Sequence, residues 1–203
     1  MDLKYHLVSY VGIFLLFLTP SCNSSSPEDK IDTRKITVVS NDELEEKTVS
    51  ISGEVNFDVS FPESWERIID STIEYGAIMK CDSSFKYCPN FQFFYSPRRK
   101  KYSLKKYAFA FVNLQSKELE DSKIETVGFS DLSSDDLKLL VMEQILTLGE
   151  LQLTNLVAIY ESPDSKNILF LSMLGDLNDK RQTPVFKEIF PQIINSVKFP
   201  NRK

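Results

Sequence analysis

The chain contains a single histidine, His6, which lies directly before an apolar segment near its start. The remaining residues therefore lack the side chain that most often serves as a general base or a metal ligand. This absence excludes a Ser-His-Asp or Cys-His catalytic site and the usual catalytic zinc sites built within the domain. We predict no catalytic residue, no metal site and no cofactor.

Glycine is also scarce, with six in 203 residues, and none forms a loop that cradles phosphate groups. The acidic string from Asp131 to Asp136 lacks the glycine of an EF-hand calcium loop, so we expect it to cap a helix. The net charge of −5 argues against a general nucleic-acid binder, because such binding depends on neutralising phosphates. A hydrolase built on two carboxylates is disfavoured, since no pair is singled out.

Residues 1–21 have the features of a bacterial lipoprotein signal peptide. Lys4 precedes an apolar run from Leu7 to Leu18, which is shorter than the about 20 residues that span a bilayer. The run ends in Leu-Thr-Pro-Ser-Cys22, which resembles a lipobox, where bacteria attach diacylglycerol to the cysteine thiol. We expect a lipid anchor on Cys22 that holds the protein in the cell envelope, on the inner or the outer membrane. The alternatives are cleavage without lipidation and an uncleaved anchor.

Export would bring the two other cysteines, Cys81 and Cys88, into an oxidising compartment, where disulfides persist. A bridge between them would close a short loop and contribute about 2.5 kcal/mol to stability. We predict this structural disulfide. Two free buried thiols are the first alternative. A redox-active pair is the second, and the spacing disfavours it because it differs from Cys-x-x-Cys.

The composition along the chain predicts four segments. Residues 1–21 form the signal peptide, and the polar residues 22–35 form a flexible tether that cannot bury enough apolar surface to fold. Residues 36–52 contain two short β-prone runs and are expected to be lead-in strands or partly ordered. Residues 53–199 have the length and apolar content of a single domain.

Two patterns within this domain are clear. Apolar and polar residues alternate over 55–61, which predicts a strand with one face on a core. Ser103 is a good N-cap residue, and the apolar residues after it recur at spacings of three and four, which predicts a helix to about Leu119. The same spacing predicts a second helix from Asp135 to Leu148, with Gly149 as its C-cap.

The remaining elements are predicted from shorter patterns. They are strands over 68–79, 90–95 and 124–129, a hairpin of 156–160 with 168–174, and a final helix over 183–196 kinked at Pro191. This order lacks the regular alternation of strands and helices that is typical of a parallel sheet. We predict an α+β fold in which helices pack on an antiparallel sheet.

Residues 56–65 are expected to form a strand that runs into a Pro-x-x-Trp turn, and residues 190–199 a closing helix that leads into Ser-Val-Lys-Phe. These two segments resemble the opening and the end of PsbP-like domains. The helix that opens at Ser103 also fits, so the resemblance covers residues 53–199. It implies an α-β-α sandwich with Phe61 and Trp65 in the core, and it implies binding rather than a reaction. The helix predicted over 135–148 departs from it, because the family implies more strand there.

A basic cluster stands out in this acidic chain. It comprises Arg98, Arg99, Lys100, Lys101, Lys105 and Lys106, with tyrosines interleaved. These side chains are candidates for contact with an anionic partner, and each basic residue near an anionic surface contributes about 1 kcal/mol. The alternative is a solvated loop. We therefore predict a non-enzymatic module that binds or assembles with another envelope protein at the membrane face. The alternative function is a carrier that holds a small ligand or lipid in a cleft between sheet and helix.

Overall fold

The computed structural model describes residues 44–51, 55–68, 75–119, 122–134, 137–161 and 166–199. The predicted signal peptide, Cys22 and the tether lie outside the described residues. The first described element is strand β1 (Leu44–Ile51), which pairs antiparallel with β2 (Val55–Pro62). Val49 and Ile51 are buried in the same core as β2. The packed unit therefore includes residues 44–51, which the sequence analysis placed in the lead-in.

Seven further strands form one antiparallel sheet in the order β3-β4-β5-β9-β8-β7-β6. They are β3 (Glu66–Arg67), β4 (Tyr75–Ile78), β5 (Asn90–Pro97), β6 (Ser122–Asp131), β7 (Lys138–Leu148), β8 (Leu151–Glu161) and β9 (Asn167–Asp176). The α+β prediction is confirmed. The predicted pairing of the last two strands is also present as β8 with β9, although the turn residues 162–165 lie outside the described residues.

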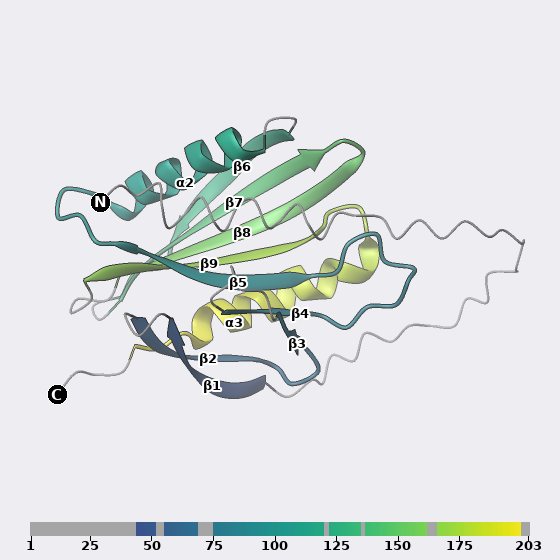
Figure 1. Cartoon of the computed structure of the whole chain (residues 1–203), viewed down its shortest axis with the longest axis horizontal. Helices are drawn as coiled ribbons and strands as arrows, with labels where there is room; N and C mark the ends of the chain where they lie inside the picture. Colours follow the sequence, from purple (N-terminus) through teal and green to yellow (C-terminus); the bar gives the residue numbers. More distant parts are fainter. Residues whose placement is uncertain are drawn as a thin grey trace, which may run out of the picture.

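The two faces of the large sheet are covered by different elements (Figure 1). Helix α2 (Leu104–Glu118) packs on one face, where Phe94 stacks with both Phe111 of the helix and Phe170 of β9. Helix α3 (Phe190–Ser196) and the β1–β2 pair cover the other face. The fold is thus an α-β-α sandwich, as the PsbP-like resemblance implies.

Several local predictions hold in detail. The buried residues of β2 alternate as expected, and Pro62 is its last residue. Trp65 is buried against Phe91, with ring centroids 5.8 Å apart, so its role is structural. Ser103 caps α2, since its hydroxyl accepts a hydrogen bond from the Lys106 N–H at 3.3 Å.

The helix predicted over 135–148 is wrong, because residues 138–148 form strand β7. β7 lies between β6 and β8 in the sheet. One of its faces is buried, and the other is buried or half-buried except at the exposed Glu143, so apolar residues occur on both faces of the strand. Leu140, Met142 and Leu146 are buried on one face of the strand, at the two-residue period that a strand requires. Apolar residues of the same segment also recur at helical spacing, and this second pattern led to the helix prediction. Ser133 lies in the segment that was expected to cap this helix. Its hydroxyl instead accepts a hydrogen bond from the N–H of Leu139, in β7, at 3.1 Å.

Gly149 has positive φ, as a C-cap glycine would, but it stands in the two-residue turn that joins β7 to β8. A left-handed residue suits a tight hairpin as well as a helix end. The prediction of a left-handed conformation at Gly149 is therefore correct, but the element that ends there is a strand and not a helix.

The C-terminal helix is interrupted near Pro191, as predicted. A 3₁₀ turn (Lys180–Gln182) leads into a π-helical turn (Val185–Ile189), and α3 follows. Proline has no N–H to donate to the preceding turn, which here widens so that the Phe190 N–H bonds to the Val185 carbonyl. The Tyr160 hydroxyl then donates to the Ile194 carbonyl at 3.0 Å and holds α3 on the sheet.

Candidate anion-binding cleft

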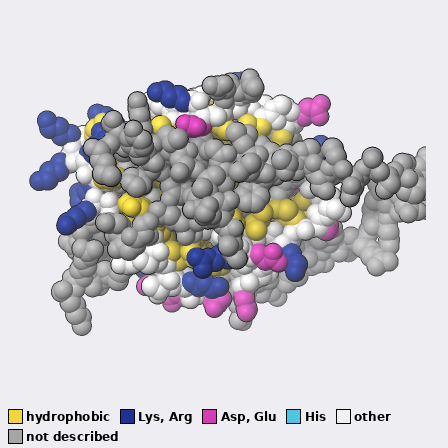
Figure 2. Space-filling model, in the orientation of Figure 1, with side chains coloured by type: hydrophobic (Ala, Val, Ile, Leu, Met, Phe, Trp, Pro, Cys, Tyr) yellow, Lys and Arg dark blue, Asp and Glu magenta, His cyan; other side chains and the backbone are white. Residues whose placement is uncertain are grey.

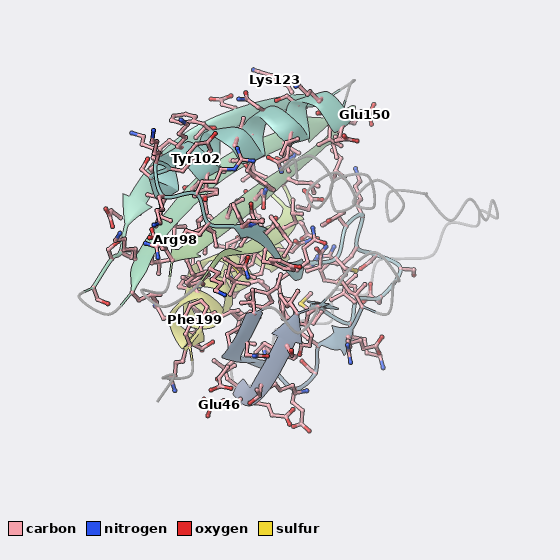
Figure 3. The ribbon with its side chains drawn as sticks, turned by 60° about the vertical axis from the view of Figure 1, so that its left-hand side comes forward. Glu46, Arg98, Tyr102, Lys123, Glu150 and Phe199 are labelled. Atoms are coloured by element: carbon pink, nitrogen blue, oxygen red, sulfur yellow. The ribbon has the colours of Figure 1, made fainter. Side chains whose placement is uncertain are left out.

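A cleft of about 500 Å³ opens at the end of the sheet where β5 leads into α2. Its walls come from four separate parts of the chain: residues 98–105, the end of β6, the start of β7 and the end of β8. Figure 2 shows Lys and Arg side chains gathered at this end of the molecule. In Figure 3, Arg98 and Tyr102 lie at this end, and Glu150 lies at the opposite end of the sheet. We call this feature the basic cleft.

Four residues of the predicted cluster line the basic cleft, namely Arg98, Arg99, Lys100 and Lys105. Lys101 and Lys106 belong to the same loop and helix turn but are not part of the lining. The lining also contains Lys138, against only two carboxylates. In a chain with a net charge of −5, this concentrates positive charge in one concave site.

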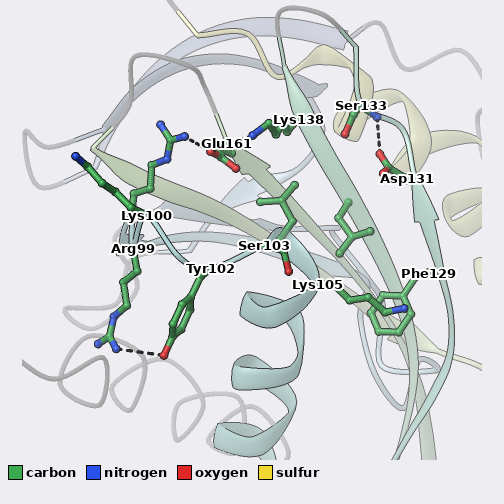
Figure 4. Close-up of a pocket in the computed structure, with 13 residues that line it drawn as sticks. Arg99, Lys100, Tyr102, Ser103, Lys105, Phe129, Asp131, Ser133, Lys138 and Glu161 are labelled. Carbon is green, nitrogen blue, oxygen red and sulfur yellow. Dashed lines mark hydrogen bonds and ion pairs between the residues drawn. The ribbon is translucent and has the colours of Figure 1, made fainter.

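One carboxylate holds the floor of the cleft together. Glu161 is only 7% exposed, and it forms ion pairs with Arg98 and, at 3.5 Å, with Lys138 (Figure 4). The antiparallel register of β7 and β8 places Lys138 directly opposite Glu161. A buried carboxylate needs such partners because desolvation penalises its charge. The charges of Arg98 and Lys138 are therefore partly neutralised within the protein.

Three other cations of the cluster, Arg99, Lys105 and Lys106, lie over aromatic rings. The Tyr102 ring has the Arg99 guanidinium at 5.4 Å and the Lys106 ammonium at 4.1 Å from its centroid. The Lys105 ammonium lies 5.2 Å from the Phe129 centroid (Figure 4). Within the described part of the chain, no ion pair includes Arg99, Lys100, Lys101, Lys105 or Lys106. Arg99, Lys105 and Lys106 are therefore positioned by aromatic rings and not by a carboxylate of the described residues.

Backbone contacts fix the loop that carries these side chains. The Arg98 N–H donates to the Lys166 carbonyl at 2.7 Å. The Tyr107 hydroxyl accepts from the Arg99 N–H at 2.5 Å and donates to the Pro97 carbonyl at 3.1 Å. Burial raises the pKa of Tyr107, so its hydroxyl stays protonated and can donate. The cations are thus presented from a constrained loop.

Sequence reasoning missed Glu161, Lys138, Asp131 and Phe129 as parts of this site. Each lies alone at or near a strand end, and neither composition nor spacing relates it to the basic loop. Hydrogen bonds from the Ser133 side chain and from the Ser133 N–H, the latter at 3.0 Å, lower the pKa of the Asp131 carboxyl. Only pairing of the strands brings these residues to the cluster.

The predicted disulfide residues lie at the other end of β5. Cys81 and Cys88 are unbridged and half-buried, and a hydrogen bond joins their thiols. Burial raises the pKa of both thiols. Their proximity is compatible with a disulfide, which remains a prediction.

A second arginine anchors this cysteine loop. The Arg181 guanidinium donates to the Ser84 hydroxyl at 2.7 Å and to the Asp179 carboxylate at 2.6 Å, and it lies 3.9 Å from the Phe85 ring centroid. The hydrogen bonds from Arg181 lower the pKa of Asp179. The fully buried Gln182 side chain adds bonds to the Asp176 N–H and the Tyr87 carbonyl.

The described ranges contain no group of three or more histidine, cysteine or acidic side chains that could hold a metal ion. None of the helices described is long and apolar enough to cross a membrane.

Comparison with known proteins shows the fold. Neither a scan of protein-family models nor a search of the curated proteins finds a match to the chain. Among solved structures, cyanobacterial PsbP from Synechocystis is similar, with a TM-score of 0.60 and 10% identity over 83% of this chain and 99% of that one. LpqN from Mycobacterium tuberculosis, described as involved in cell envelope biogenesis, has a TM-score of 0.51 and 14% identity over 77% and 92%. The Ran-binding protein Mog1p from Saccharomyces cerevisiae has a TM-score of 0.51 and 10% identity over 77% and 96%. The PsbP-like resemblance is therefore confirmed at the level of the fold.

Proposed function

We propose that this protein is a lipid-anchored component of the bacterial cell envelope that binds an acidic segment of another envelope protein in the basic cleft. The observation that carries the proposal is the cleft itself. It gathers cations in an acidic chain, and two of them, Arg99 and Lys105, lie on aromatic rings and form no ion pair among the described residues. An anionic group that enters the cleft would give these cations a further favourable interaction.

The anchoring part of the proposal rests on residues 1–22. The apolar run followed by Leu-Thr-Pro-Ser-Cys22 supports export and attachment of lipid to the cysteine. Two or more acyl chains would keep the domain at the membrane surface, because each buried methylene contributes about 0.8 kcal/mol. The domain would then meet its partner within the reach of the tether.

The proposed role is binding without catalysis. The two carboxylates in the cleft are already engaged, Glu161 by Arg98 and Lys138, and Asp131 by the Ser133 N–H. The similar structures include a protein described as Ran-binding and one described as involved in cell envelope biogenesis, which is compatible with a binding role. Fold similarity alone does not assign a function, so the proposal depends on the cleft.

Crosslinking and affinity purification of the full-length protein in cells test this proposal. Wild type is compared with Arg99→Glu/Lys100→Glu in the cleft and with Lys86→Glu/Lys187→Glu as a control. Lys86 and Lys187 are exposed and lie outside the cleft, and the control makes the same change in net charge. We expect one reproducible partner that is lost in the cleft variant and retained in the control. Retention of that partner by both variants would contradict binding through the cleft.

The anchor is tested in the same experiment with Cys22→Ala. The proposal expects this variant to leave the membrane fraction and to lose the partner. Intact mass of the wild-type protein should show the added acyl chains. A membrane-bound protein without an added lipid mass would contradict lipidation of Cys22.

A carrier of a small anionic ligand is the second candidate function. Its support is the volume of the cleft, about 500 Å³, which falls in the range of small-molecule sites, and its place between α2 and the sheet. Mass spectrometry of the protein under native conditions distinguishes the two functions. A bound small molecule that is lost in Arg99→Glu/Lys100→Glu, without a protein partner, would favour the carrier.

A further inference from the structure

The large apolar side chains that remain exposed are concentrated beside the basic cleft. In the described part of the chain these are Phe109, Val127, Leu132 and Leu177, with exposures of 50%, 53%, 52% and 44%. Val127 lies in β6, Leu132 directly follows β6, and Phe109 lies on α2 and contacts Phe129 of β6. Phe109 thus meets β6 through Phe129, and Val127 and Leu132 lie in or directly after the same strand. We call Phe109, Val127, Phe129 and Leu132 the apolar rim.

A bulge in β6 accounts for the exposure of Val127. Thr126 pairs with Gln144, and Gly128 pairs with the next residue, Glu143, so that Val127 is left without a partner in β7. A bulge of this kind re-aims a side chain and is common next to functional sites. β6 is also the last strand of the sheet, so Val127 stands at an open border. Exposed apolar groups that gather in this way are typical of contact surfaces.

The apolar rim is continuous with the cleft. Phe129 belongs to both, because it lines the cleft and its ring lies 5.6 Å from that of Phe109. The Lys105 ammonium lies over the same Phe129 ring. Leu132 directly follows Asp131, another residue of the cleft lining. A ligand that reaches the cations of the cleft from this side passes over the rim.

We infer that the partner segment carries an aromatic or aliphatic side chain that packs on the apolar rim while its acidic side chains enter the basic cleft. This inference rests on the proposed function and specifies the partner: an acidic protein segment with an apolar anchor residue. Charge complementarity selects the acidic residues, and burial of the anchor against Phe109 and Phe129 adds affinity that does not depend on salt.

The shape of the site favours a protein segment over a lipid surface or a second copy of this chain. The cations line a concave cleft whose floor contains the Glu161 carboxylate. Single carboxylate side chains can enter such a cleft, whereas a planar membrane meets only its outer edge. A second copy would bring its own cationic loop to the surface, and like charges would face each other.

Synthetic peptides test the inference with the full-length protein in detergent. The probe is a fluorescein-labelled peptide with three glutamates, a spacer of one to four serines and one phenylalanine. Matched peptides replace the phenylalanine with serine, or the glutamates with glutamines. Binding is measured by fluorescence anisotropy at two salt concentrations. We expect at least one spacer length at which the phenylalanine peptide binds about tenfold more tightly than its serine counterpart.

Protein variants assign that preference to the rim. Phe109→Ser should remove most of the tenfold difference and leave binding of the glutamates intact. Leu177→Ser removes an apolar side chain of similar exposure that follows β9, outside the rim, and should leave the difference unchanged. Arg99→Glu/Lys100→Glu should weaken both peptides, and salt should do the same.

The outcomes separate the inference from the function on which it rests. If the glutamate peptides bind in a cleft-dependent manner but phenylalanine adds nothing at any spacer length, the apolar anchor is overturned and the proposed function stands. If glutamates and glutamines bind equally, the proposed function fails. Competition of the peptides by phosphatidylglycerol vesicles would assign the surface to lipid and overturn the inference. Self-association that Phe109→Ser abolishes, measured by sedimentation velocity, would assign it to a second copy.

Discussion

A loop adjoins each end of strand β5, and arginine side chains have different roles at the two loops. Before β5, the loop that contains Cys81 and Cys88 is held by Arg181, whose guanidinium bonds to Ser84 and Asp179. After β5, Arg99 and Lys105 lie over aromatic rings. Neither these two residues nor Lys100 takes part in an ion pair of the described chain.

This difference separates a cation that stabilises the fold from cations that are available to a ligand. Arg181 gains its interactions within the protein, so its removal should lower stability. The first turn of α2 contains Lys105 and Lys106 and no acidic residue, although the helix dipole favours acidic residues there. The helix dipole therefore disfavours Lys105 and Lys106 at this position, which is expected of residues whose role is contact with an anion. The contrast can be tested by substitutions at each end.

The largest effect is expected from Gln182→Ala at the cysteine-loop end. Gln182 is fully buried, and it accepts from the Asp176 N–H at 2.8 Å and donates to the Tyr87 carbonyl at 2.7 Å. Its truncation leaves two buried backbone groups without partners, so urea unfolding should show a loss of about 3 kcal/mol. Peptide binding at the cleft should be unchanged. Asn113→Ala, at an exposed position of α2, serves as the control, and equal stability of the two variants would contradict this account.

The next effect concerns the cysteine loop. Oxidation of Cys81 and Cys88 to a disulfide should raise the free energy of unfolding by about 2.5 kcal/mol, because the bridge restricts the unfolded chain. Intact mass before and after reduction detects the bridge in protein recovered from the cell envelope. Urea unfolding of the oxidised and the reduced protein measures its contribution. Two alkylatable thiols in freshly isolated protein would show that the pair stays reduced.

A direct comparison of the two arginines should show a smaller difference. Arg181→Ala should destabilise the protein by about 1 kcal/mol, a value reduced by the partial exposure of its side chain. Arg99→Ala should change stability by no more than about 0.5 kcal/mol while it weakens binding of the glutamate peptides. Thermal unfolding and anisotropy on the same two variants check both expectations. If Arg99→Ala destabilised the protein more than Arg181→Ala, the proposed difference between the two ends of β5 would be wrong.

The smallest effect depends on pH. The Arg181 guanidinium holds the pKa of Asp179 below its usual value in the folded state. The stability that this carboxylate provides is therefore present above the ordinary carboxyl pKa of about 3.9 and is lost as the pH falls through the lower folded-state pKa. Asp179→Asn should be less stable than wild type by less than about 1 kcal/mol at pH 7. This difference in the free energy of unfolding should disappear at acidic pH. A difference that persists at pH 2 would assign it to packing. Glu63→Gln, at an exposed position, is the control.

Much of the fold follows from local patterns. The Ser103 cap and the spacing of apolar residues predicted α2 almost to its last residue, and alternation predicted β2. Pro191 marked the interruption of the last helix. These features depend on neighbouring residues along the chain, such as a capping hydroxyl or a missing N–H. They are encoded in a few adjacent positions and can be read there.

The basic loop could be located in the same way, but the cleft could not. Six basic residues close together in an acidic chain are visible without a structure. The cleft also requires Phe129, Lys138 and Glu161, which come from three different strands. No spacing relates these positions, because they meet only when β6, β7 and β8 pair in their particular register.

The sequence by itself thus determined where α2 begins, which residues of β2 face the core and where positive charge collects. Tertiary structure alone decided that residues 138–148 form a strand, since a run with apolar residues at both strand and helix spacing suits either a strand or a buried helix until its neighbours are in place. It also decided which cations are neutralised. Arg98 and Lys138 form ion pairs with the Glu161 carboxylate because strand pairing brings it to them. Arg99 and Lys105 contact the aromatic side chains of Tyr102 and Phe129 and form no ion pair among the described residues.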